Sequence, residues 1–127
     1  STKKIIIFKG EGGRDWLADT LKQAGATVEA ISTYTRVPLS IDNPAWHAIK
    51  EMDFSKSLWV LTSSEAARYL GSITKEQLTQ SLQSAAALCP HHNIADAARA
   101  IGFGDVFTTE SGDTALIKAT LAWLTIQ

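Results

Sequence analysis

The sequence predicts an α/β protein built on a parallel sheet of about five strands flanked by helices. Short apolar segments rich in β-branched residues alternate along the chain with amphipathic segments of helical period. Glycine or a small polar residue stands at most of the junctions, where helices begin or end. The 127 residues have the length of one domain and can bury a substantial core. We therefore expect residues 1–127 to form a single unit.

The first part of the chain is expected to give a strand, a helix and a second strand. Residues 3–9 form the first strand and residues 27–35 the second, because both are rich in β-branched residues. Residues 14–24 form the helix between them, which Gly25 ends. The inward face of this helix is predicted to carry Trp16, Leu17, Leu21 and Ala24.

The rest of the chain continues the alternation. Three short apolar strands are predicted at residues 58–62, 86–89 and 105–109. The last helix spans residues 113–126, and Gly102 ends the helix before it. Consecutive strand–helix–strand units are right-handed, which leads to a flavodoxin-like, Rossmann-like sheet of order 2-1-3-4-5. Four of the helices are expected to begin at polar caps: Asn43 before Pro44, Ser63 with Ser64, Thr74 in the capping box TKEQ, and Asn93.

Composition narrows the choice of partners. The net charge of −1 gives no general attraction to nucleic acid or to an acidic membrane, so we expect neither as a partner. No apolar run approaches membrane-spanning length, and only four apolar residues follow Lys3 and Lys4, too few for a signal peptide. Cys89 is the single cysteine, which favours a reducing cytoplasm.

Ligands of such sheets bind where the parallel strands end. The segments expected at that edge are rich in Gly, Ser, Thr, Tyr and basic residues. Most of them lead into helix N-termini, whose free N–H groups favour anions. The sequence therefore predicts an anion-binding crevice there, formed by residues 9–14, 33–36, 62–64, 90–93 and 109–112.

The glycine loop IIIFKGEGGR lacks the phosphate-loop and dinucleotide patterns. Its glycines either bring backbone amides close to an anion or only permit a tight turn. Among other candidates, adjacent His91 and His92 should point apart, and no metal ligand set surrounds them. Cys89 is expected to be a buried hydrophobe, and Ser63 a helix cap rather than a nucleophile. Tyr34 is either a structural aromatic or a hydroxyl donor at the crevice.

Three segments taken in order resemble the second half of the uroporphyrinogen-III synthase (HemD) family. They are KGEGGRDWLADTLKQAGATVEAISTYTRV, LWVLTSSEAARYL and CPHHNIADAARAIGFGDVFTTESGDTALIKA. The resemblance covers essentially the whole chain, and it rests on the order and spacing of these motifs rather than on one of them. The chain departs from the family near His91, His92 and Asn93, where many relatives have other residues.

The resemblance implies an enzyme that cyclises the linear tetrapyrrole hydroxymethylbilane to uroporphyrinogen III, inverting the last pyrrole ring, without a metal or cofactor. It implies Tyr34, from its place in Y-x-R, as the catalytic proton donor or water-positioning group. The carboxylates of the substrate would meet the crevice described above. The residues expected to bind them are Gly10, Gly12, Gly13, Arg14, Thr62, Ser63, Ser64, Asn93 and Ile94.

The family enzyme has two α/β lobes with the substrate between them, and its chain crosses from one to the other. This chain would thus need the N-terminal half of the enzyme or a swapped second copy as its partner, with a swap boundary near residues 36–57. The extended crossing favours the swapped dimer over a closed monomer, and the isolated half should be inactive. The alternative is a non-catalytic anion- or nucleotide-binding flavodoxin-like module.

Overall fold

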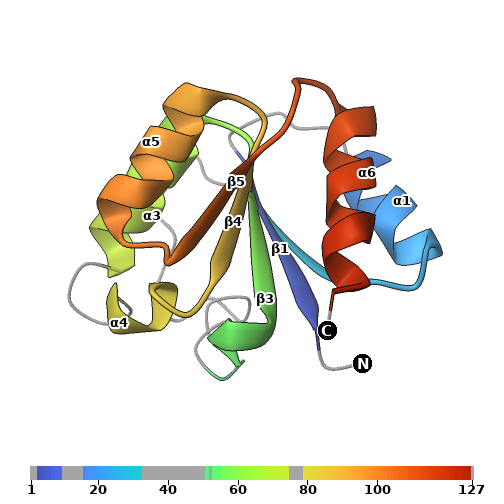
Figure 1. Cartoon of the computed structure of the whole chain (residues 1–127), viewed down its shortest axis with the longest axis horizontal. Helices are drawn as coiled ribbons and strands as arrows, with labels where there is room; N and C mark the ends of the chain where they lie inside the picture. Colours follow the sequence, from blue (N-terminus) through green and yellow to red (C-terminus); the bar gives the residue numbers. More distant parts are fainter. Residues whose placement is uncertain (1–2, 10–15, 33–50, 52, 75–78, 127) are drawn as a thin grey trace.

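The computed structural model describes residues 3–9, 16–32, 51, 53–74 and 79–126, and within them it contains one parallel sheet (Figure 1). The strand order is β2-β1-β3-β4-β5, with parallel pairing throughout. The predicted α/β class and the predicted strand order are both confirmed. The strands are β1 (Lys4–Lys9), β2 (Thr27–Ser32), β3 (Ser57–Leu61), β4 (Ala86–Cys89) and β5 (Asp105–Thr108).

Helices cover both faces of the sheet. Helices α1 and α6 lie on one face, and α3 and α5 lie side by side on the other (Figure 1). A short 3₁₀ segment, Phe54–Lys56, leads directly into β3. The helices are α1 (Trp16–Gln23), α3 (Ser64–Thr74), α4 (Thr79–Leu82), α5 (His92–Ile101) and α6 (Asp113–Leu124).

The central strands are buried on both faces, which explains why they read as continuous apolar runs rather than as alternating ones. In β1, Ile5 and Ile7 face the α1–α6 layer, while Ile6 and Phe8 face the α3–α5 layer. All of β3 is buried in the same way, with Trp59 in the larger cluster. Edge strand β5 is mostly exposed, because no further strand lies beyond it in the described sheet.

Several predicted helix boundaries hold and others do not. Gly25 follows α1 with φ of 94°, and Gly102 follows α5 with φ of 111°, so both occupy the left-handed conformation that ends a helix.

The predicted inward face of α1 is wrong at its ends: Trp16 is 50% exposed and Ala24 is exposed. The buried residues of α1 are Leu17, Ala18 and Leu21, so the inward face lies in the middle of the helix and not at its ends.

Helix α3 is longer than expected. It continues through Thr74, so this residue belongs to the last turn of α3 and does not start a new helix. The remainder of the predicted TKEQ capping box, and the predicted helix at Asn43 and Pro44, lie outside the described residues. None of the helices that the structure describes is long and apolar enough to cross a membrane.

Lys3 connects the start of the described chain to the end of α6. Its Nζ donates to the backbone carbonyls of Trp123 at 3.2 Å and Leu124 at 3.3 Å, and also to that of Ile126. The ammonium lies 5.0 Å from the centroid of the Trp123 ring. A cation at the carboxyl end of a helix satisfies carbonyls that have no partner within the helix. Lys3 and the end of α6 therefore lie together at the edge where the strands begin (Figure 1).

Candidate functional site

All five described strands point their carboxyl ends to one edge of the sheet, opposite Lys3 and the end of α6 (Figure 1). The chain leaves β1 toward β2 on one side, whereas β3, β4 and β5 follow on the other side. The order therefore reverses between β1 and β3, and this is the place where open α/β sheets bind ligands. Thr62 and Ser63 follow β3 directly at this point.

Ser63 is the N-cap of α3. Its Oγ accepts a hydrogen bond from the N–H of Ala66 at 3.0 Å, and its carbonyl accepts from the N–H of Ala67 at 3.1 Å. Thr62, Ser63 and Ser64 are all partly buried. The structural interpretation of Ser63 is thus confirmed. The cap uses only a lone pair of the hydroxyl, so the hydroxyl hydrogen is not consumed by this bond.

The N-cap of α5 is His91, which corrects the prediction of Asn93. The backbone of His91 is extended, with φ of −156° and ψ of 146°, and its Nδ1 accepts from the N–H of Asn93 at 3.1 Å. The carbonyl of His91 accepts from the N–H groups of Ile94 and Ala95, both at 3.1 Å. Sequence reasoning missed this cap because histidine is not among the preferred N-cap residues.

Asn93 and Ile94, the two predicted binding residues of this turn, therefore differ in whether a ligand can reach their side chains. The side chain of Asn93 is exposed, while its N–H is held by His91. The side chain of Ile94 is 8% exposed and packs in the core cluster that contains Phe8 and Trp59. Ile94 positions the helix rather than offering its side chain to a ligand.

His91 and His92 do not point apart. Their rings stack with centroids 4.5 Å apart and planes inclined by 27°. The expected divergence applies within a strand, whereas here the chain passes from extended backbone at His91 into the first helical residue at His92. Among the residues that the structure describes, no group of three or more His, Cys, Asp or Glu side chains is arranged to hold a metal ion.

Cys89, at the end of β4, is fully buried. Burial raises the pKa of its thiol to about 11, and the positive charge of Arg99 acts in the opposite direction with a smaller effect. The thiol therefore stays protonated at neutral pH, and a protonated thiol is a poor nucleophile. The expectation that Cys89 is a buried hydrophobe is confirmed.

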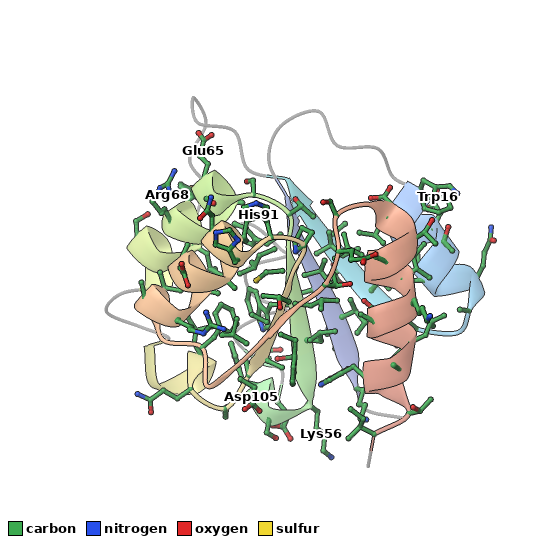
Figure 2. The ribbon with its side chains drawn as sticks, turned by 45° about the horizontal axis from the view of Figure 1, so that its top comes forward. Trp16, Lys56, Glu65, Arg68, His91 and Asp105 are labelled. Carbon is green, nitrogen blue, oxygen red and sulfur yellow. The ribbon has the colours of Figure 1, made fainter. Side chains whose placement is uncertain are left out.

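The structure brings the segment after β3 and the turn after β4 to neighbouring positions on the same edge. Figure 2 shows His91 at the same end of the molecule as Glu65 and Arg68, the exposed charged residues of the first turns of α3. Trp16 stands at this end as well, while Lys56 and Asp105 lie at the opposite end. The predicted site residues outside the described part are Gly10, Gly12, Gly13, Arg14 and Tyr34.

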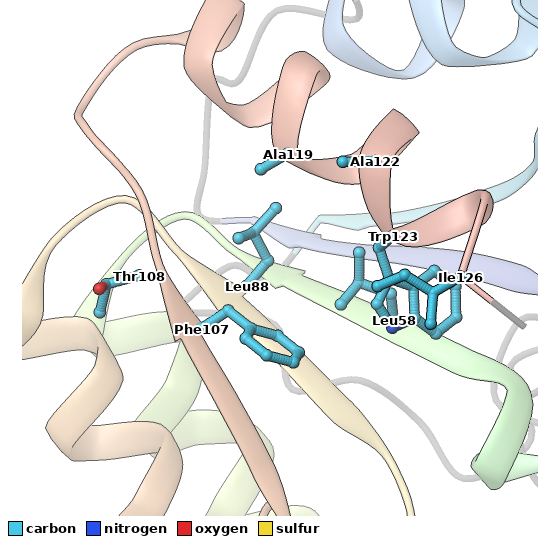
Figure 3. Close-up of a pocket in the computed structure, with 8 residues that line it drawn as sticks. All are labelled: Leu58, Leu88, Phe107, Thr108, Ala119, Ala122, Trp123 and Ile126. Atoms are coloured by element: carbon cyan, nitrogen blue, oxygen red, sulfur yellow. The ribbon is translucent and has the colours of Figure 1, made fainter.

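The described surface also has hollows away from this edge. An apolar pocket of about 210 Å³ lies between α6 and the β3–β5 part of the sheet (Figure 3). A more polar hollow of about 260 Å³ lies beside Lys3 and residues 24–27, near the start of the strands. Neither one includes a predicted site residue. The apolar pocket is lined by Leu58, Leu88, Phe107, Thr108, Ala119, Ala122, Trp123 and Ile126.

Comparison with known proteins gives the family. The family model described as uroporphyrinogen-III synthase HemD matches residues 1–118. The chain is 29% identical over 119 residues to uroporphyrinogen-III synthase of Escherichia coli (strain K12), covering 92% of this chain and 48% of the relative. The enzyme of Salmonella typhimurium (strain LT2) matches with the same identity and coverage. The chain spans about half the length of these relatives, and it belongs to the uroporphyrinogen-III synthase HemD family.

Proposed function

We propose that this chain supplies one wall of the substrate cleft of a uroporphyrinogen-III synthase. The observation that carries the proposal is that the family match, residues 1–118, runs through both segments at the candidate edge. These segments are residues 62–64 after β3 and residues 91–94 after β4. The substrate would be the linear tetrapyrrole hydroxymethylbilane and the product uroporphyrinogen III.

The edge suits a ligand that carries many carboxylates. Helices α3 and α5, which both begin there, direct the positive ends of their dipoles toward it. Thr62 and Ser63 add hydroxyl groups at the point where the strand order reverses. Several modest contacts of this kind orient a flexible substrate without a strongly charged cluster.

Ring closure needs the substrate to lose its terminal hydroxyl as water, and this departure needs a proton. In our proposal the Tyr34 hydroxyl donates that proton or positions the water that does so. The cationic azafulvene that remains is stabilised by orientation and by hydrogen-bonding dipoles. The proposal uses no metal and no organic cofactor.

The second wall of the cleft must come from elsewhere. We propose the other half of the enzyme, or a swapped second copy of this chain, as its source, since the chain spans about half of its relatives. Alone, the chain should bind a tetrapyrrole weakly and turn it over little, because most contacts made in the transition state would be missing. The buried single thiol suits the cytoplasm, which we propose as the compartment.

The experiment is a cyclisation assay with hydroxymethylbilane, with the purified chain, the full-length E. coli enzyme and buffer run in parallel. We expect the chain to fall at least about 10²-fold below the full-length enzyme, as expected when substrate positioning is lost. Turnover near that of the full-length enzyme would contradict the one-wall proposal.

A binding arm separates the synthase proposal from the alternative, a non-catalytic anion- or nucleotide-binding module. The chain is titrated with uroporphyrin III and, separately, with ATP, at low and high salt. Saturable, salt-sensitive binding of the porphyrin alone supports the synthase proposal. Binding of ATP without the porphyrin would favour the alternative.

A further inference from the structure

We propose that the apolar pocket between α6 and the β3–β5 part of the sheet binds an uncharged aromatic molecule of one or two rings. The pocket has a volume of about 210 Å³ and lies on the face of the sheet that α6 covers (Figure 3). It is separate from the candidate edge, because none of residues 62–64 and 91–94 lines it. This second site is independent of the proposed synthase reaction.

Two alanines of α6 create the space. Ala119 and Ala122 line the pocket with one methyl group each, so the helix leaves the space above Leu88 open (Figure 3). The floor is tightly packed, since Leu58 and Leu88 lie in strands β3 and β4 and are only 1% and 3% exposed. Phe107 of edge strand β5 borders the pocket and is 44% exposed. The pocket therefore has a preformed floor and an accessible side next to the edge strand.

The volume and the aromatic lining set the size and shape of the ligand. An apolar protein cavity of about 150 Å³ holds one benzene ring, whereas pockets for drug-sized ligands begin at about 300 Å³. Two aromatic side chains line the pocket from different elements, Phe107 from β5 and Trp123 from α6 (Figure 3). Aromatic rings attract one another in stacked and edge-to-face arrangements, which favours a flat aromatic ligand over an aliphatic one.

The charges around the pocket favour a neutral ligand. The eight described residues that line it are all uncharged. The ammonium of Lys3 lies 5.0 Å from the centroid of the Trp123 ring, but it already donates to backbone carbonyls at the end of α6. A carboxylate placed in the pocket would lose its hydration without a lining cation to replace it. The pocket therefore disfavours a ligand with several carboxylates, the kind proposed for the candidate edge.

A docked protein would need a larger apolar surface than this pocket offers. A stable interface buries about 800 Å² on each partner. Among the residues that the structure describes, the exposed large apolar side chains are Trp16, Phe107 and Ile126, and only the last two line the pocket. Trp16 stands at the candidate edge instead (Figure 2). Two exposed side chains do not provide an interface of that size, which leaves a small molecule as the occupant.

The test is a titration of the ¹⁵N-labelled chain with indole, followed by NMR. We expect saturable shifts of the amide signals of Phe107, Ala119 and Ala122, with a Kd of about 1 mM or below, as is reasonable for so small a ligand. Benzoate has as many non-hydrogen atoms as indole but carries a charge, so it should bind at least about tenfold more weakly. Equal binding of the two ligands would overturn the proposal.

Variants locate the binding. Ala122→Leu fills the pocket from α6 and should weaken indole binding at least about tenfold. Ala100→Leu is the matched control, because Ala100 is also an exposed helical alanine but lies on α5, on the other face of the sheet (Figure 1). This control should bind indole as the wild type does. Urea unfolding checks that each variant is folded, and Phe107→Ala, which removes an exposed aromatic wall, gives a second test of the same pocket.

Three results would overturn the proposal. The first is the absence of saturable shifts at the three amide signals. The second is indole binding that neither Ala122→Leu nor Phe107→Ala weakens. The third is a wild-type dimer that does not bind indole and that Ala122→Leu dissociates in light scattering, since the pocket would then hold a second copy of the chain.

Discussion

At the scale of single residues, Gly104 shows how closely two backbone segments approach each other. Its N–H donates to the carbonyl of Leu82 at 3.1 Å, which fixes the start of β5 against the turn after α4. A Cβ at Gly104 would collide with the backbone carbonyl oxygen of Gln83. Gly25 differs, since its φ is +94° but a Cβ there would meet no atom within 4 Å. Gly104 is required because no Cβ fits between the two backbone segments, and Gly25 is required because its φ is positive.

Gly104→Ala should therefore destabilise the protein more than Gly25→Ala. For Gly104→Ala we expect a loss of about 3 kcal/mol or more in the free energy of unfolding, because backbone and not a flexible side chain must move. Gly25→Ala should lose about 1 kcal/mol, the cost of a non-glycine residue in the left-handed region. Urea denaturation of both variants gives the comparison, and equal losses would contradict it.

Cys89 provides a second prediction at this scale, through its protonation. Its pKa is raised from 9.0 to about 11 by burial, so the folded state keeps the thiol proton longer than the unfolded state does. The stabilisation is fully present below pH 9 and should be lost as the pH rises toward 11. Cys89→Ala should flatten this alkaline part of the stability curve, measured by urea denaturation between pH 8 and 11.

Labelling of Cys89 by iodoacetamide gives an independent check. The native protein should react far more slowly than the urea-unfolded protein, because both burial and protonation protect the thiol. Equal native and unfolded labelling rates would show that the thiol is accessible.

At the scale of elements, α3 is held at its amino end by the Ser63 cap. The Oγ of Ser63 accepts from the Ala66 N–H, and no such bond is described for Ser64, the first residue of the helix. Ser63→Ala should cost about 1 kcal/mol in the free energy of unfolding, whereas Ser64→Ala should change it by less than about 0.5 kcal/mol. Thermal and urea unfolding measure both, and equal effects would argue against the cap.

The same helices show how far a sequence can predict structure. The strand positions and the Ser63 cap follow from strong local signals, namely β-branched runs and a hydroxyl before a helical pattern. The strand order follows from the right-handed connections between parallel strands. The inward face of α1 differs from the prediction at Trp16 because the burial of a helix end depends on its neighbours in three dimensions. The His91 cap and the His91–His92 stacking depend on a turn geometry that residue preferences do not encode. At the candidate edge, residues 62–64 and 91–94 could be placed together from topology alone.

At the scale of the whole molecule, the first strand–helix–strand unit, made of β1, α1 and β2, meets the other described elements mainly through two contacts. Strand β1 pairs with β3, and α1 packs beside α6. In a swapped dimer a second copy would supply the same two contacts, with the exchange near residues 36–57. Because both forms contain the same interfaces, their balance depends on protein concentration and on the connection between the parts.

We expect a dimer that exchanges this unit to be populated at high protein concentration. Light scattering over a dilution series should show the mass rising toward twice 13.7 kDa. A monomer mass at every concentration would exclude the swap.

The central position of β1 has a consequence for the time course of folding. Lys4, near the start of the chain, pairs with Ser57, so the middle of the sheet cannot close until a distant segment arrives. Contacts between residues far apart in sequence form slowly, and until then the apolar edge of β1 remains open. The speed of this closure relative to molecular encounter decides whether each chain finds its own β3 or that of a neighbour. Refolding at high dilution should therefore yield closed monomers even where crowded refolding yields exchanged pairs.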